Sequence, residues 1–232
     1  MIDIGTLELA DIAIGGTPIE KAYIDSTLVW EKSAPVPKYD AQVEWLSSTG
    51  GQYIQLPLTV PKATFFQVEF DCIPVYLSVS YNNRYGIFGG SPYQQCECSF
   101  YSGSASAITY GSYLGTKNAS GAVGVTPDVK NHVIFSTTQI HTYTEDGDIT
   151  NRSVARPLTA NITAFRVFGA YRYANYRYPI KYCNFKITVG DNLVYDLIAV
   201  RKDGVGYMYD KISGNLLGNS GSGSFTYGDD II

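Results

Sequence analysis

Charge is scarce in this 232-residue chain, where Asp, Glu, Lys and Arg together make up 16% against a usual share of about a quarter. The net charge is −4, and no concentrated basic face argues for a polyanion, so nucleic acid is excluded as the main partner. No segment approaches the ~18 uninterrupted apolar residues of a membrane span. The N-terminus carries acids early and has no basic segment before an apolar run, so we expect no secretory signal.

Cysteine and histidine are also rare, with four cysteines and two histidines. The cysteines are too few and too irregularly spaced for a disulfide framework: Cys72, Cys96, Cys98 and Cys183. Cys96 and Cys98 would share one face of a strand, but no second pair accompanies them, and His132 and His141 are remote in sequence. We therefore expect buried free thiols and no metal site.

Tyrosine and glycine are plentiful, with 20 and 23 residues, a composition typical of strands and tight turns. Residues 65–73 alternate between apolar and polar side chains, which predicts a half-buried strand with one wet face. Residues 182–189 alternate in the same way, and the pattern places Cys183 and Phe185 on the buried face and Tyr182 on the wet face.

Further short strands are expected at 85–89, 96–101, 107–111, 132–136, 141–143 and 165–169. So many short antiparallel strands, with hardly any helical periodicity, favour two packed sheets over an α/β fold. Segments of small residues, 102–106 and 119–125, are expected to be rim loops.

The first 32 residues have a rhythm of their own, in which turn residues recur about every ten positions. Apolar alternation predicts a small three-strand meander with Ile12 and Ile14, Ala22 and Ile24, and Leu28 and Trp30 on successive strands. Two prolines in residues 33–39 then favour an extended linker. We expect a module at 1–32, a linker at 33–39 and a domain at 40–232. Three strands bury little surface, so the module is expected to dock onto a neighbour.

The best-defined local pattern lies near the C-terminus. Residues 192–200 have strand composition, and Asp203-Gly204 predicts a tight turn. Residues 207–210 are expected to form the returning strand. Ser213-Gly214 then predicts a second turn before residues 215–217. The segment is therefore expected to be a three-strand meander.

This segment, Val200 to Phe225, resembles the C-terminal signature of concanavalin A-like (laminin G-like) jelly-roll domains in structural proteins of tailed phages and prophages. Residues 43–54, VEWLSSTGGQYI, look like the opening strand motif of the same domains. The resemblance therefore covers residue 40 to the C-terminus. It implies an all-β fold, a concanavalin A-like jelly-roll β-sandwich with a small N-terminal β module.

The resemblance also implies a function. It is that of a non-enzymatic virion structural protein, made in the host bacterial cytoplasm and exposed on a phage tail, baseplate or capsid fibre. The jelly roll would contact a host-surface glycan or another virion subunit, and residues 1–32 would bind other virion subunits. The alternative is a bacterial cell-surface carbohydrate-binding or adhesion protein, against which the missing signal sequence counts.

A glycosidase is the third class considered. Laminarinase-type enzymes share the jelly roll and carry a Glu-x-Asp-x-Glu strand motif, and this chain has Glu69, Asp71 and then Ile73. A retaining glycosidase needs two carboxyl groups flanking the scissile bond, so the loss of one removes the mechanism. Glu69 and Asp71 are therefore expected to be wet-face residues of the strand, and no catalytic residue is assigned.

The candidate binding residues form a tyrosine-rich segment that consists of Tyr171, Arg172, Tyr173, Tyr176, Arg177 and Tyr178. Aromatic faces stack on the apolar face of a sugar ring while Arg donates to its hydroxyls, so the composition suits a glycan or protein contact. A tyrosine ladder against a neighbouring chain, which would make the protein a homo-oligomer, and plain structure remain open. A fainter cluster of the same kind lies at residues 81–85, where Asn82-Asn83 primarily indicates a turn.

Residues 143–149 hold three acids around a glycine and could bind calcium, a frequent accessory of laminin G-like domains. A hairpin turn at Asp146-Gly147 explains the segment without a bound ion, and it is the interpretation that we favour. No cofactor is therefore assigned.

Overall fold

The computed structural model describes residues 12–14, 17–19, 21–24, 27–31, 38–75, 84–91, 97–101, 107–111, 120–153, 158, 160–169 and 180–231. Every regular element in these ranges is a β-strand. None of the described residues forms a helix long and apolar enough to cross a membrane. The chain divides into two compact units, Met1–Pro37 and Lys38–Ile232.

The first unit contains two hairpins. Strand β1 (Ile12–Ile14) pairs with β2 (Thr17–Ile19), and β3 (Lys21–Ile24) pairs with β4 (Thr27–Glu31). The expected three-strand meander is therefore replaced by two separate pairs within the described residues. Pro18 lies inside β2, where a two-stranded ribbon tolerates it because each strand is an edge and can leave one N–H position unpaired.

The larger sheet of the second unit is antiparallel, with β15, β14, β13, β8, β17, β18, β19 and β20 in spatial order among the described residues. Short strands β5, β6 and β21 attach to it through β18 and β17. The bounds are β5 Ala41–Gln42, β6 Leu46–Ser47, β8 Phe66–Pro74, β13 Asn131–Ser136, β14 Gln139–Thr144, β15 Gly147–Ser153, β17 Ile180–Val189, β18 Asn192–Lys202, β19 Val205–Asp210, β20 Asn215–Leu217 and β21 Thr226–Tyr227.

The smaller sheet has the order β12, β11, β10, β9, β16, β7 among the described residues. Its strands are β7 Ile54–Leu56, β9 Arg84–Ser91, β10 Glu97–Tyr101, β11 Ala107–Gly111, β12 Ser120–Gly124 and β16 Ala164–Val167. The short strands predicted from the sequence between 85 and 169 are all present, and their bounds differ from the predicted ones by no more than two residues.

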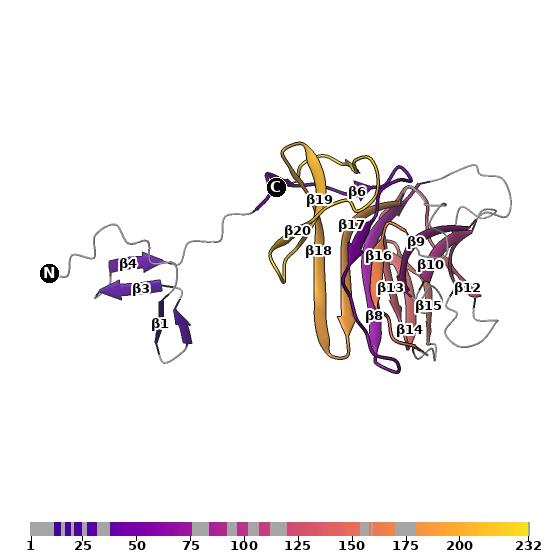
Figure 1. The fold of residues 1–232 in the computed structure, drawn as a ribbon, viewed down its shortest axis with the longest axis horizontal. Helices are drawn as coiled ribbons and strands as arrows, with labels where there is room; N and C mark the ends of the chain where they lie inside the picture. Colours follow the sequence, from indigo (N-terminus) through magenta and orange to yellow (C-terminus); the bar gives the residue numbers. More distant parts are fainter. Residues whose placement is uncertain are drawn as a thin grey trace. The chain divides into compact units, whose positions relative to one another are not determined.

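The two sheets pack face to face around an aromatic core (Figure 1). Phe70 of the larger sheet meets Phe88 of the smaller sheet at 5.6 Å between ring centroids, and Phe88 stacks on Phe165 at 5.7 Å. All three rings are fully buried. Such aromatic pairs add about 0.5–1.5 kcal/mol each beyond their area burial. The face of the larger sheet turned away from this core is called the outer face below.

Strand β8 confirms the predicted alternation. Phe66, Val68, Phe70 and Cys72 are buried, and the residues between them are half-buried on the outer face.

The alternation predicted for residues 182–189 is wrong at its start. The pairing of β17 with β8 shifts register between Tyr182 and Asn184, so Cys183 is the extra residue of a β-bulge. Tyr182 consequently points into the core, where its hydroxyl donates to the Ile87 carbonyl at 3.1 Å.

The loop predicted at residues 119–125 is also wrong, because most of that segment is strand β12. It pairs with β11 in full register and lies close to β15. A Cβ on Gly124 would meet Ile149 Cγ2 at 2.5 Å, so the small residue lets these two strands approach each other. At Gly124 the lack of a side chain thus reflects the close approach of two strands rather than a loop.

The C-terminal meander is confirmed. Strands β18 and β19 are joined at Asp203-Gly204, whose φ angles of 51° and 72° are those of a two-residue hairpin turn that favours glycine. Strand β19 then pairs with β20. The turn between them is closed by the Gly214 amide, which donates to the Asp210 carbonyl at 2.8 Å.

Candidate functional site

A row of polar side chains crosses the outer face of the larger sheet. Strand register places Asp148 of β15 opposite Tyr143 of β14, Tyr143 opposite His132 of β13, His132 opposite Asp71 of β8, and Asp71 opposite Asn184 of β17. We call these five residues the polar row. Its ends lie four inter-strand spacings apart, or about 19 Å at ~4.8 Å each.

Asp71 is the centre of the row. Its side chain is 14% exposed, contacts the His132 Nδ1 atom and lies 3.4 Å from the Lys130 ammonium. Asn184 Nδ2 donates to Asp71 Oδ2 at 2.7 Å, and the Asp71 amide donates to Asn184 Oδ1 at 3.0 Å. The carboxylate is therefore held in one orientation by three side chains from two segments of the chain.

Tyr143 lies between the two histidines of the chain. Its ring stacks on His132 with centroids 4.7 Å apart and planes 15° from parallel, and it contacts His141 at 4.8 Å and 37°. His141 Nε2 lies 2.8 Å from Asp148 Oδ1, and this hydrogen bond lowers the pKa of the Asp148 carboxyl. The tyrosine is half-buried, so an aromatic edge is presented on the outer face in a fixed orientation.

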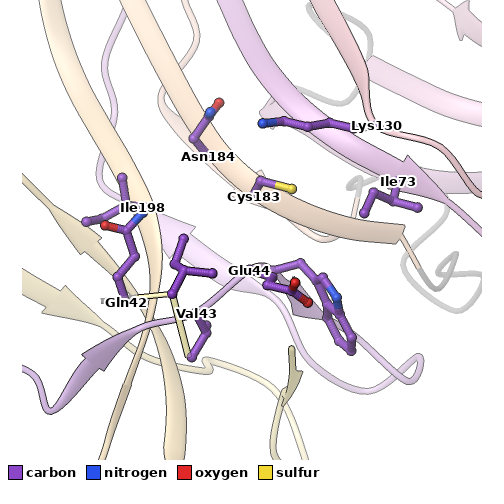
Figure 2. A pocket seen from close by; sticks show the side chains of 10 residues that line it. Gln42, Val43, Glu44, Ile73, Lys130, Cys183, Asn184 and Ile198 are labelled. Atoms are coloured by element: carbon purple, nitrogen blue, oxygen red, sulfur yellow. The ribbon is translucent and has the colours of Figure 1, made fainter. Parts of the chain in front are cut away.

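A pocket of about 350 Å³ adjoins the Asn184 end of the row (Figure 2). It lies between the outer face and the segment that leads from β5 to β6. The lining residues are Gln42, Val43, Glu44, Trp45, Ile73, Lys130, Cys183, Asn184, Ile198 and Ile231. The Lys181 ammonium covers the Trp45 ring, 4.2 Å from a ring centroid. This cation–π contact fixes one wall of the pocket.

The bulge at Cys183 turns its thiol toward this pocket (Figure 2). Burial raises the pKa of Cys183 to about 11, and the nearby Asp71 and Glu44 carboxylates add to the effect, while Lys130 opposes it. The thiol is therefore neutral near pH 7 and contributes an apolar surface. Cys72, its neighbour on β8, is free and fully buried in the core, and burial raises the pKa of its thiol as well. These two confirm the expectation of free thiols, although Cys183 is only half-buried.

The two carboxylates of the glycosidase-like motif face different partners. Glu69 lies on the outer face with its Oε1 atom 3.7 Å from the Lys186 ammonium, whereas Asp71 is bound within the polar row. Ile73 lines the pocket where the motif would have its third carboxylate. The strand is amphipathic, as the sequence predicted.

The tyrosine-rich segment, Tyr171 to Tyr178, lies outside the described residues, so its role stays a prediction. The same holds for Asn82-Asn83 in the fainter cluster.

The acidic segment 143–149 contains a two-residue hairpin turn at Glu145-Asp146, followed by Gly147 with a φ of 129°. Among the described residues, no group of three or more His, Cys, Asp or Glu side chains could hold a metal ion.

The sequence patterns do not predict the polar row. They place His132 and His141 on two separate short strands and indicate no role for Tyr143, Trp45 or Lys130. The available signal was the alternation itself, because His132 sits between buried residues of β13 and Tyr143 lies two residues after His141 on β14. The register between the two strands, which brings the rings together, could not be obtained from either strand alone.

No protein-family model matches the sequence, and no curated protein matches it. Among solved structures, the chain is similar to a Bacteroides ovatus ATCC 8483 protein assigned provisionally as carbohydrate-binding, with a TM-score of 0.52 and 11% identity over 88% of this chain and 66% of that one. This chain thus spans just under two thirds of that protein's length.

The chain is also similar to the heptameric SAP-like pentraxin of Limulus polyphemus, with a TM-score of 0.46 and 10% identity over 84% of this chain and 98% of that one. A botulinum neurotoxin type C structure gives a TM-score of 0.38 and 9% identity over 77% and 47%. Of these three similarities, the one to the Bacteroides protein has a TM-score above 0.5. At 11% identity, it shows the fold alone. The predicted fold class, an all-β jelly-roll sandwich of the concanavalin A-like kind, is confirmed.

Proposed function

We propose that this chain is a non-enzymatic carbohydrate-binding protein, and that the polar row and the adjoining pocket form its glycan-contacting surface. The observation that carries the proposal is the Tyr143 ring, fixed between two imidazoles beside the Asp71–Asn184 cluster. The exposed edge of this ring offers an apolar contact to the C–H face of a sugar, and the remaining lone pairs of the fixed Asp71 carboxylate can accept hydrogen bonds from its hydroxyls.

The rigidity of these groups favours binding. Side chains already fixed by their neighbours lose little conformational entropy when a ligand arrives. From Asn184 to Tyr143 the row spans three inter-strand spacings, about 14 Å. A short oligosaccharide laid across the strands would therefore reach from the pocket to the tyrosine, and a monosaccharide would not.

The partners of the carboxylates argue against hydrolysis. A retaining glycosidase needs two carboxyl groups about 5–5.5 Å apart, one of them protonated, on either side of the scissile bond. Here Glu69 faces Lys186, and Asp71 is engaged by His132, Lys130 and Asn184. Each carboxylate thus faces a cation or a hydrogen-bond donor, which favours a binding role over a catalytic one.

The finer assignment, a virion structural protein of a tailed phage or prophage, is supported by the resemblance of residues 43–54 and 200–225 to such domains. Under it, the protein resides in the virion, residues 1–32 bind other virion subunits, and the sandwich meets a host-surface glycan. A bacterial cell-surface adhesion protein would use the same face. Tail or capsid genes beside this one would favour the first, and a secretion signal in the full-length gene would favour the second.

The binding proposal is tested with a glycan array followed by calorimetry on the oligosaccharides that bind. Tyr143→Ala removes the ring and should weaken binding about 30-fold, the equivalent of ~2 kcal/mol for a central aromatic contact. Tyr143→Phe keeps the ring and serves as the matched control, with near-normal binding. A wild-type protein that binds no glycan, or a Tyr143→Ala variant that binds normally, would refute the proposal.

A further inference from the structure

The pocket beside the polar row has an apolar floor. Ile73, Ile198 and the neutral Cys183 thiol line it from β8, β18 and the bulge of β17. Ile73 and Ile198 lie on the outer face, where the same pleat elsewhere carries Glu69, Asp71 and Lys186. Such a floor favours a ligand that carries an apolar substituent, because a hydroxyl group in its place would lose its hydrogen bonds to water.

The rim of the pocket carries one charge of each sign. In Figure 2, Lys130 and Asn184 lie on one side of Cys183, and Glu44 lies on the other. The Lys130 ammonium has three N–H donors, and one of them faces the Asp71 carboxylate at 3.4 Å. Glu44 is exposed, and its carboxylate forms no ion pair in the described part of the chain. The rim can therefore both donate a hydrogen bond and accept one.

The Asn184 amide, by contrast, is already committed. Its nitrogen donates to the Asp71 carboxylate and its oxygen accepts from the Asp71 backbone. It shapes the wall without selecting the ligand. Selectivity then comes from Lys130, Glu44 and the floor.

The volume of the pocket, about 350 Å³, lies at the small end of the ~300–1,000 Å³ range of small-molecule sites. One sugar ring with its substituents fits this size, and a branched glycan does not. The rest of a longer glycan would extend along the polar row.

We infer that the pocket takes the acetamido group of an N-acetylated amino sugar, an inference that rests on the proposed function. The methyl group lies on the floor beside Ile198 and Cys183, Lys130 donates to the amide carbonyl, and Glu44 accepts from the amide N–H. A deacetylated sugar would keep its nitrogen near Glu44 but would lose the carbonyl that accepts from Lys130 and the methyl group that lies on the floor. A plain hexose would leave the floor unused.

The test compares three β-1,4-linked disaccharides by calorimetry on the full chain: the di-N-acetylglucosamine, glucosamine and glucose forms. The N-acetylated form should bind at least about 10-fold more tightly than either of the others, the discrimination expected for one methyl group in an apolar pocket. Ile198→Phe fills the floor and should abolish this preference. Ile212→Phe, the same change at an exposed turn residue outside the pocket, should leave it intact.

A second measurement needs no variant. Alkylation of Cys183 by iodoacetamide, followed at the peptide level by mass spectrometry, should be slowed by the N-acetylated disaccharide and not by the glucose form. Binding without N-acetyl preference, or no protection of Cys183, overturns this inference and leaves the proposed function standing. A chain that binds none of the three, but binds other glycans through Tyr143, likewise overturns this inference alone, whereas a chain that binds no glycan overturns both proposals.

Discussion

Asp71 and Asn184 hold each other through two hydrogen bonds: the Asp71 amide donates to Asn184 Oδ1 at 3.0 Å, and Asn184 Nδ2 donates to the Asp71 carboxylate at 2.7 Å. The pair lies directly beside the bulge at Cys183, where the regular ladder between β8 and β17 is interrupted. The side-chain amide thus satisfies a backbone N–H that the bulge would otherwise leave without a strand partner.

Asn184→Ala should therefore lower the free energy of unfolding by about 1–2 kcal/mol, because it leaves the half-buried Asp71 amide and carboxylate with fewer partners. It should also weaken glycan binding, since the carboxylate is no longer fixed. Urea denaturation and calorimetry measure the two effects. Asn192→Ala, at the exposed start of β18, is the matched control and should change neither. Equal stability of the two variants would contradict the role given to Asn184.

Cys183 should react slowly with alkylating reagents at neutral pH. Its pKa of about 11 leaves roughly one thiol in ten thousand ionised at pH 7, and the thiolate is the nucleophile. The rate should rise about tenfold per pH unit up to pH ~10. Lys130→Met removes a cation that lowers the pKa of this thiol, so the variant should react more slowly still. A Cys183 that reacts as fast as an exposed thiol would show that the pocket does not desolvate it.

The sequence predicted the fold where local patterns were complete. The meander of β18 to β20 follows from Asp203-Gly204 and Ser213-Gly214, because each turn requires its residues, and β8 follows from simple alternation. Prediction failed where a contact between distant segments decided the outcome. The bulge at Cys183 reverses the alternation of β17, and the approach of Ile149 to Gly124 turns a segment of small residues into a strand.

The candidate site was not predictable in the same way. Asp148, Tyr143, His132, Asp71 and Asn184 come from five strands, and each is unremarkable in its own strand. Composition highlights the dense cluster at 171–178, whereas a binding face on a sheet is assembled from single residues at matched register positions.

If the tyrosine-rich segment is also a recognition surface, Tyr173→Ala and Tyr176→Ala should weaken attachment or subunit association without lowering the melting temperature.

Asp210 should be important for the stability of the C-terminal meander. The residue is 1% exposed, and its carboxylate accepts hydrogen bonds from the backbone amides of Asp196, Ile212 and Ser213 at 3.1–3.2 Å and from the Ser213 hydroxyl at 2.6 Å. Asp210→Ala would leave these donors without their acceptor and should cost about 2–4 kcal/mol.

The measurement is urea denaturation of Asp210→Ala beside Asp191→Ala, which changes an exposed turn residue between β17 and β18. The control should stay within about 0.5 kcal/mol of the wild type. Asp210→Asn, which keeps one acceptor oxygen, should lie between the two. A loss of stability at position 191 as large as that at 210 would argue against a specific role of the Asp210 carboxylate.

Acid should remove the contribution of the Asp148–His141 pair to stability. The hydrogen bond from His141 lowers the pKa of Asp148 in the folded protein. A carboxyl group with a lowered folded pKa stabilises the protein fully above its unfolded pKa, about 3.9, and the contribution is lost as the pH falls through the folded pKa. The melting temperature of Asp148→Asn should therefore lie below that of the wild type near pH 6, and the difference should shrink to nothing as the pH drops below ~4. Asp146→Asn, in the same hairpin turn, should show no such pH-dependent gap. A gap at position 148 that persists unchanged in acid would mean that packing of the side chain, and not its charge, supports Tyr143.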